Sequence, residues 1–299
     1  MAKIFDLNIT DATSIDDFAY AANSINLDSE DEISSLAPKL KALSNNKEWL
    51  QEFISEGLLN PTGFQQDNLY SSQSCILRTI GERSFLRFAV WAPKTFGEQL
   101  DEDNFFSYST AHNHDFSLLT AGYLGPGYET SIYKINNFEN VIGYPGEHVD
   151  IEFTERFRLE PGRVVLYEAG TDIHVQHEPT SISVSLNLIV AQPQMNIRQL
   201  YFDTRAKRIG GYVGNSTLKR GIFFRFAAAM PSKENFDMLL AITNSHPCEL
   251  TRIYAYRALA QSYQELPTVE DMMRHDSSQL VRSSVQLLKN GLQTLHVWG

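Results

Sequence analysis

The sequence predicts a mainly β barrel with helical ends, and three observations support this fold class. Short β-rich runs separated by turn clusters fill the middle of the chain, over about 69–213. The residues on either side follow the 3.6-residue periodicity of helices. An apolar fraction of 42%, with 11% aromatic residues, is ample for a packed core. We therefore predict an N-terminal helical cap (1–66), a barrel (67–215) and a C-terminal α-helical domain (216–299).

Charge and composition exclude several classes of partner. The chain has 25 basic and 36 acidic residues, a net charge of −11, so we expect no nucleic-acid partner. Two cysteines, Cys75 and Cys248, indicate no disulfide framework and fit a reducing cytosol. The N-terminus has no signal-peptide core, and no apolar run approaches the roughly eighteen residues of a membrane span. We expect a cytoplasmic protein with no membrane partner.

Two helical segments are predicted before the barrel. Ser14 followed by Asp17 resembles a helix start. A second helix is predicted as one segment over about 33–55, ended by Gly57 and the Asn60-Pro61 pair.

The barrel is predicted from nine β-rich runs separated by glycine- and proline-containing turns. These runs are 75–80, 85–91, 116–124, 130–135, 149–159, 164–168, 173–177, 182–190 and 200–203. Many short strands at this spacing favour a sandwich or barrel over alternating β-α units.

The C-terminal region is predicted to be helical again. The expected helices are 218–230, 233–243, 248–262, 269–274 and 277–288. Leu250-Thr251-Arg252 and Leu280-Val281-Arg282 form a weak internal repeat, which is similar to the helix pairs of HEAT-like solenoids. The alternative is a set of ordinary helices that support the barrel.

Three histidines are the candidate metal ligands. His112-Asn113-His114 lies at the start of a strand-like segment, where alternation places both imidazoles on one face. Phe116 and Leu118 continue that face and would exclude water. His174 follows sixty residues later. We predict that His112, His114 and His174 hold one metal ion inside the barrel.

These motifs resemble those of the cupin superfamily. Its first motif has H-x-H on a strand; here this is His112-Asn113-His114, with Gly122 closing the strand. Its second motif has a P-x-G-like turn before a later histidine; here these are Pro161-Gly162, then Gly170 and His174. The resemblance covers about 75–205 and implies a double-stranded β-helix, the cupin jelly roll. Cupins often pair through barrel edges, so the resemblance is compatible with a homodimer.

The ligand set resembles one cupin branch in particular. The glutamate ligand of many cupins would fall at Leu118 or Leu119 and is missing, which is similar to the three-histidine thiol dioxygenases (cysteine dioxygenase and its relatives). That branch's Ser-His-Tyr relay falls on Ser185, Asn187 and Ile189, where only the serine is present. The resemblance implies a mononuclear non-haem Fe(II), O2-dependent oxygenase of an amino-acid-like substrate, acting by hydroxylation or oxidative C–H or C–N chemistry. Thiol dioxygenase activity is the first alternative.

Three residues are predicted to act in the pocket beside the metal. Ser185 and Asn187 share a strand face that should look into the barrel, and Tyr128 follows the glycine-rich turn at 125–127. The alternatives are a structural hydrogen bond for Asn187 and a simple tight turn for the glycines.

Further residues are predicted to contact substrate. Arg78 is placed like the arginine that binds a substrate carboxylate in the thiol dioxygenases, and it belongs to a cluster with Arg83 and Arg87. The alternative for these arginines is surface ion pairing. Gln176 shares the face of His174. The other predicted contacts are Tyr123, Glu129 and Tyr133, of which the tyrosines could supply the missing phenol.

Other chemistries remain as alternatives on the same residues. A 2-oxoglutarate-dependent oxygenase would need His-x-Asp, but Asp115 should face away, and no basic residue follows His174 until Arg198. Zinc would accept the same three histidines. A non-catalytic metal- or ligand-binding cupin, with its helical tail as a protein-interaction surface, is the alternative from a different class.

Overall fold

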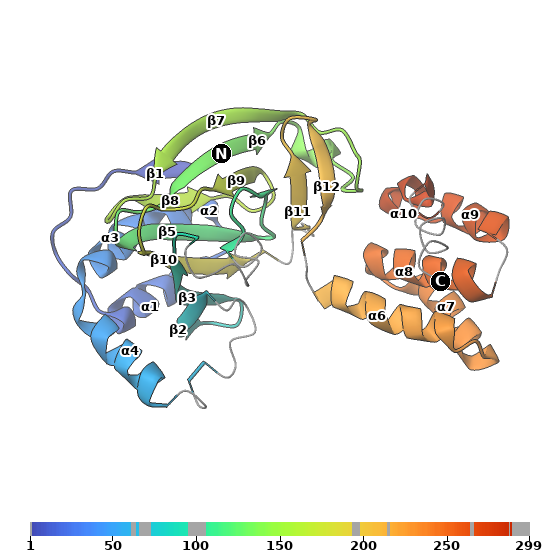
Figure 1. The fold of residues 1–299 in the computed structure, drawn as a ribbon, viewed down its shortest axis with the longest axis horizontal. Coiled ribbons are helices and arrows are strands. Elements are labelled where there is room, and N and C mark those ends of the chain that lie inside the picture. The colour runs from blue at the N-terminus through green and yellow to red at the C-terminus, as the bar shows by residue number, and fades with distance from the viewer. Residues whose placement is uncertain are drawn as a thin grey trace. The chain divides into compact units, whose positions relative to one another are not determined.

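The computed structural model describes residues 2–60, 64–65, 73–94, 106–192, 198–213, 216–263, 266–286 and 288. The chain divides into two compact units (Figure 1). The first comprises Met1–Glu139 and Val149–Lys207, and the second comprises Asn140–His148 and Arg208–Gly299.

The first unit contains both sheets and the N-terminal helices. Its helices are α1 (Ile15–Asn23), α2 (Glu30–Ser35), α3 (Ala37–Asn45) and α4 (Glu48–Leu59), and the 3-10 helix η1 (Phe138–Asn140) follows β6. Its strands are β1 (Lys3–Phe5), β2 (Ser74–Ile80), β3 (Ser84–Trp91), β4 (Ala111–His112), β5 (Phe116–Leu124), β6 (Glu129–Ile135), β7 (Ile151–Arg158), β8 (Val164–Tyr167), β9 (Asp172–Gln176), β10 (Ser183–Ala191) and β11 (Leu200–Asp203).

The strand order defines the fold. Strands β3 to β10 are divided between two antiparallel sheets with the orders β8-β5-β10-β3 and β4-β9-β6-β7. Strands β1 and β2 extend the two edges of the first sheet, and β11 extends the second beside β4. Eight strands distributed in this way form a jelly roll. The predicted double-stranded β-helix with helical ends is confirmed. Among the described strands of this unit, the sequence analysis missed the short strands β1 and β4.

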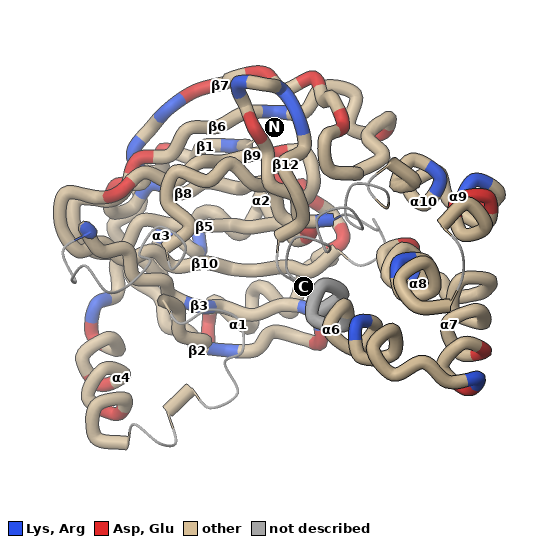
Figure 2. The backbone as a smooth tube through the Cα atoms, turned by 45° about the vertical axis from the view of Figure 1, so that its right-hand side comes forward, with Lys and Arg blue, Asp and Glu red and all other residues tan. Residues whose placement is uncertain are grey.

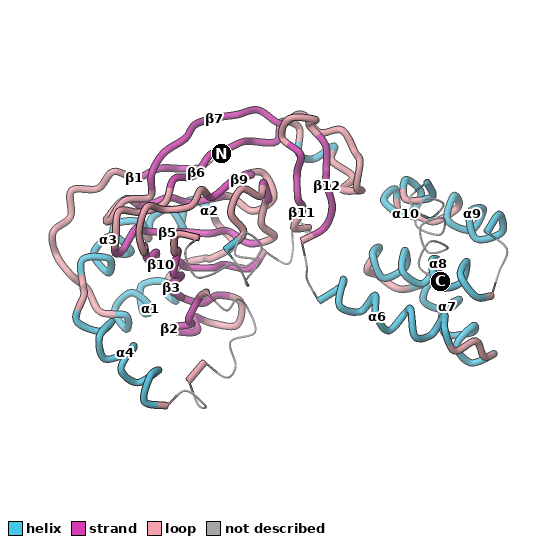
Figure 3. Tube along the Cα trace, viewed as in Figure 1, coloured by secondary structure: helices cyan, strands magenta, loops and turns pink. Residues whose placement is uncertain are grey.

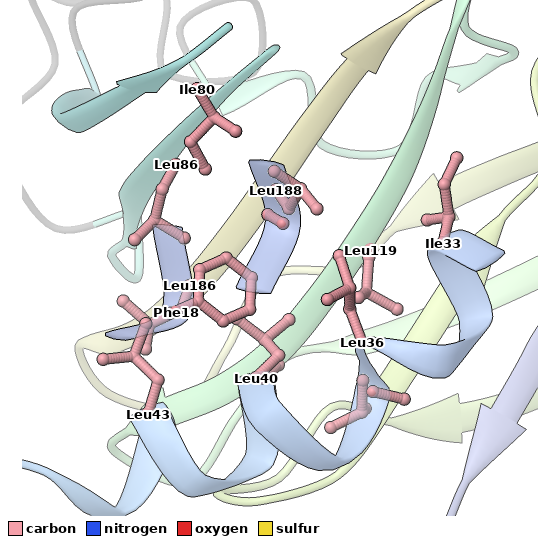
Figure 4. Packing of buried hydrophobic residues seen from close by; sticks show 14 of the residues in the cluster. Phe18, Ile33, Leu36, Leu40, Leu43, Ile80, Leu86, Leu119, Leu186 and Leu188 are labelled. Atoms are coloured by element: carbon pink, nitrogen blue, oxygen red, sulfur yellow. The ribbon is translucent and has the colours of Figure 1, made fainter. Parts of the chain in front are cut away.

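The central strands of the first sheet are buried on both faces. Odd-numbered residues of β5, such as Leu119 and Tyr123, pack against the N-terminal helices, whereas Phe116 and Leu118 face the barrel interior. Figure 4 shows Leu40 of α3 directed toward the strands of this sheet. Each fully buried leucine stabilises the fold by about 1.5–3 kcal/mol. The central strands β5 and β10 accordingly carry no charged residue, while β7 carries acids and bases together (Figure 2).

The N-terminal helices begin and end at polar side chains. The Ser14 hydroxyl accepts a hydrogen bond from the Asp17 amide at 3.0 Å, which confirms the predicted helix start. The single helix expected over 33–55 is wrong, because the chain forms α2, α3 and α4 there. Pro38 lies in the first turn of α3, and Asn46 takes an extended conformation that ends it.

The second unit is mostly helical in its described part. It contains β12 (Arg208–Tyr212), α6 (Ser216–Ala229), α7 (Lys233–Ser245), α8 (Glu249–Ser262), α9 (Leu266–Arg274) and α10 (Gln279–Ser283), as Figure 3 shows. The two arginines of the weak repeat have equivalent roles: Arg252 donates to the His246 carbonyl at 2.6 Å and Arg282 to the Asp276 carbonyl at 2.7 Å. The HEAT-like assignment stays a prediction. Among the described helices, none is long and apolar enough to cross a membrane.

Candidate metal centre

Three histidine side chains converge between β4, β9 and the link that follows β4. His112 lies opposite His174 in the antiparallel pair of β4 and β9. The Nε2 atom of His174 is 3.1 Å from Nε2 of His112 and 3.0 Å from Nε2 of His114. Two nitrogens that bind one ion at about 2.1 Å and at right angles to each other are about 3.0 Å apart. The three side chains therefore form a cluster that could hold a metal ion.

Strand alternation does not explain why His112 and His114 meet, because β4 ends at His112. The explanation is Asn113, which is 0% exposed. Its side-chain amide donates to the Gly170 carbonyl at 2.8 Å, and its oxygen accepts from the Leu200 amide at 2.7 Å. The residue between the two histidines thus holds the link in place, a role that the sequence analysis missed although the H-x-H motif contains it.

Burial keeps the imidazoles neutral. It lowers the pKa of His112 and lowers the pKa values of His114 and His174 strongly, and the mutual repulsion of these rings adds to the shifts of the latter two. A neutral imidazole offers one nitrogen lone pair to a metal. The Nδ1 atom of His112 lies 3.0 Å from the Thr110 carbonyl, to which only an N–H can donate, so its Nε2 keeps the lone pair that faces the cluster.

Gln176 lies beside His174, where the sequence predicted it. Its Nε2 atom is 3.2 Å from both Nδ1 and Nε2 of His174, and its Oε1 atom is buried with no hydrogen-bond partner in the described part of the chain. Exchanging the amide oxygen and nitrogen would let Oε1 accept from Nδ1–H and would leave Nε2 of His174 for an ion. The orphaned oxygen therefore fits a metal site. Nδ1 of His114 also has no partner among described residues, and this ring stacks on Phe116 at 4.3 Å.

A row of polar side chains crosses the first sheet inside the barrel. Arg87, Asn187 and Thr120 lie side by side on β3, β10 and β5. The Thr120 hydroxyl donates to Oδ1 of Asn187 at 2.6 Å, and the Trp91 indole donates to the Ser185 hydroxyl at 3.0 Å. Ser185 and Asn187 therefore face the interior, where they make structural hydrogen bonds. Their catalytic role stays a prediction.

Tyr128 and Arg87 complete this interior. The Tyr128 ring is buried 4.4 Å from the Trp91 ring. Burial raises the pKa of Tyr128, whereas the positive charge of Arg87 and hydrogen bonds with Thr120 and Ser185 act in the opposite direction. The Arg87 charge also contributes to the low pKa of His114. Arg87, only 8% exposed, thus influences both a histidine of the cluster and the Tyr128 phenol.

The structure does not bring four of the predicted substrate contacts to the histidines. The hydroxyl of Tyr123 donates to the Asn46 carbonyl on the helix-facing side of the first sheet. The others are Arg78, which is exposed and paired with Asp16, Glu129, which is paired with Arg156 and Arg158, and Tyr133, which contacts Phe153. For the strand residues the reason is alternation, because the even-numbered side chains of β5 and β6 face the interior.

Comparisons with known proteins add little to this geometry. No family model and no curated protein matches the sequence. Among solved structures, the salicylate 1,2-dioxygenase of Pseudaminobacter salicylatoxidans is 13% identical with a TM-score of 0.27, covering 52% of this chain and 38% of that one. The DMSP lyase DddQ of Ruegeria pomeroyi is 11% identical with a TM-score of 0.26, covering 50% and 64%. A cupin 2 domain-containing protein of Halorhodospira halophila is 8% identical with a TM-score of 0.24, covering 55% and 86%.

The matched part of this chain spans less than two thirds of the dioxygenase and the lyase. TM-scores of this size carry no argument about activity or substrate. The fold assignment therefore rests on the strand order, and the site rests on the three histidines.

Proposed function

We propose that this protein is a mononuclear Fe(II)-dependent, O2-dependent oxygenase of a small amino-acid-like substrate that carries a carboxylate. The observation that carries the proposal is a cluster of three neutral imidazoles in a jelly roll with a buried arginine nearby. Three neutral imidazoles would leave a bound Fe(II) ion its full charge and three of about six coordination positions for substrate and dioxygen.

The other interior residues have distinct roles in this proposal. Arg87 binds and orients the substrate carboxylate, for which a guanidinium offers paired N–H donors. Phe116 and Leu118, both buried in the interior cluster, exclude water from the reacting atoms. Tyr128 is held protonated by its raised pKa, so its hydroxyl can donate a hydrogen bond to bound substrate at neutral pH.

Metal binding is the first test. Protein purified anaerobically is titrated with Fe(II) by calorimetry and compared with His114→Ala, His174→Ala and the control His177→Ala. The control side chain hydrogen-bonds Ser131 and does not belong to the cluster. We expect one ion per chain, with binding lost in the first two variants and kept in His177→Ala. Equal binding by all three variants would refute a three-histidine site.

Oxygen consumption tests the reaction. The iron-loaded protein is given a panel of amino acids, other carboxylates and thiols. Uptake with a non-thiol amino acid is expected to fall about 100-fold or more in Arg87→Met, which loses a charge-assisted hydrogen bond pair. Arg83→Met, which removes an exposed arginine paired with Asp28, should change little.

The alternatives give different results in the same assay. Oxygen uptake with thiols alone would establish the thiol dioxygenase alternative instead. Tightly held zinc with no uptake on any compound would favour a non-catalytic metal-binding protein. Pairing of two chains and the absence of a nucleic-acid partner stay predictions.

A further inference from the structure

A cavity lies in the first unit, on the helix-facing side of the first sheet. Its volume is about 670 Å³, and it is lined by the N-terminal segment, the end of α3, the end of β5 and the Pro161-Gly162 turn. Small-molecule sites usually occupy roughly 300–1,000 Å³. The lining contains Tyr123, whose side chain belongs to the helix-facing core, whereas the interior core surrounds the histidines. The cavity is therefore distinct from the metal centre.

In the described part of the chain, two lysines of this cavity hydrogen-bond only to neutral groups. Nζ of Lys41 donates to Oδ1 of Asn45 at 2.7 Å. Nζ of Lys47 donates to the carbonyls of Ser44 and Tyr123, each at 2.6 Å, and lies 3.6 Å from the centre of the Tyr123 ring. Among the ion pairs of the described residues, none joins either lysine to a carboxylate. Both positive charges therefore lack a negative counterpart in this part of the chain.

Two acidic side chains along the same surface are already engaged. An adjoining hollow shares Lys41 and the Pro161-Gly162 turn with the cavity and also contains Asp6 and Glu160. Both of these carboxylates pair with Arg163, at 3.1 and 2.9 Å. Lys41, Lys47 and Arg163 against Asp6 and Glu160 leave a net charge of +1 over the cavity and this hollow, in a chain with a net charge of −11.

The two ammonium groups also repel each other. Partial burial, followed by the charge of Lys41, lowers the pKa of Lys47 to about 8. Like charges that face one space are relieved by an anion placed between them. The backbone of Gly162 leaves room for this arrangement, because a Cβ atom there would lie 2.6 Å from Nζ of Lys41.

We propose that this cavity binds a small organic anion, with a phosphate or carboxylate group between Lys41 and Lys47. The amide of Asn8 and the hydroxyl of Thr10, which also line the cavity, can donate to the same group. Leu7, which also lines the cavity, would contact the apolar part of the ligand.

The test is calorimetric titration of the full chain with pyrophosphate and, separately, with citrate as probes. Lys41→Met and Lys47→Met keep most of each side-chain stem and remove its charge. Lys39→Met is the matched control, because Lys39 is an exposed residue of α3 outside the cavity. We expect binding of at least one probe to weaken about tenfold or more in each cavity variant and to stay within about twofold in the control, because a charge-assisted hydrogen bond is lost only in the former.

The outcomes are distinguishable. Binding of pyrophosphate alone indicates a phosphate ligand, and binding of citrate alone a carboxylate. No binding of either probe, or an equal loss in Lys39→Met, would overturn the proposal. If Lys47→Met lowers the melting temperature through its lost carbonyl contacts, Lys41→Met decides. His174→Ala should leave anion binding intact, which separates this site from the metal centre.

Discussion

Asn113→Ala is the substitution that best tests how the metal centre is built. It removes the side-chain bonds to the Gly170 carbonyl and the Leu200 amide while the backbone bond from Asn113 to Leu200 persists. Each of the two buried polar groups left unsatisfied costs about 1–3 kcal/mol, so we expect the free energy of unfolding to fall by about 2–6 kcal/mol. Because the same side chain holds the link between His112 and His114, metal affinity should fall as well.

Urea unfolding of the metal-free protein measures the first effect, and calorimetric titration with Fe(II) measures the second. Asn136→Ala is the control, since its exposed amide donates to Asp150 and Glu152 at 3.1 and 3.4 Å. Exposed contacts of this kind contribute less than about 1 kcal/mol. If Asn113→Ala unfolds like the control and binds Fe(II) as tightly as the wild type, the argument that Asn113 positions the histidines is wrong.

Three further substitutions test separate parts of the structure. Burial raises the pKa of Asp172 from 3.8 to about 6. Between pH 3.8 and about 6 the folded state therefore binds more protons than the unfolded state, and above this range the buried carboxylate lowers the free energy of unfolding. Asp172→Asn should therefore gain stability over the wild type as pH rises from about 4 to 7, by up to about 3 kcal/mol in urea unfolding; a pH-independent difference would contradict this. Gln176→Leu removes the partner of His174 and should weaken metal binding about 10–100-fold in the calorimetric Fe(II) titration. An unchanged affinity for Fe(II) would contradict this prediction. Gly127→Ala adds strain at φ +79° and a Cβ atom 2.2 Å from the Leu159 carbonyl, so its melting temperature should fall by more than about 4 °C, and a smaller change would show that the turn can relax.

The sequence was informative wherever a local pattern decides the outcome. All nine predicted β runs correspond to strands, because period-two alternation and turn residues act over a few neighbours. The same alternation correctly placed Phe116 and Leu118 in the interior, and it placed Ser185 and Asn187 there as well. The long helix predicted over 33–55 failed at Pro38, a local signal that was present but not used.

What the sequence could not decide is which distant side chains meet. Arg78 was expected at the metal, but a register shift between Ile76 and Arg78 places Arg78 opposite Leu86, on the helix-facing side of the sheet. Arg87 instead lies opposite Asn187 and faces the interior. The jelly roll and the pairing of His112 with His174 likewise depend on hydrogen bonds between strands far apart in the chain. Local periodicity sets the face of each side chain within a strand, but strand register, which only the folded chain fixes, selects its neighbours.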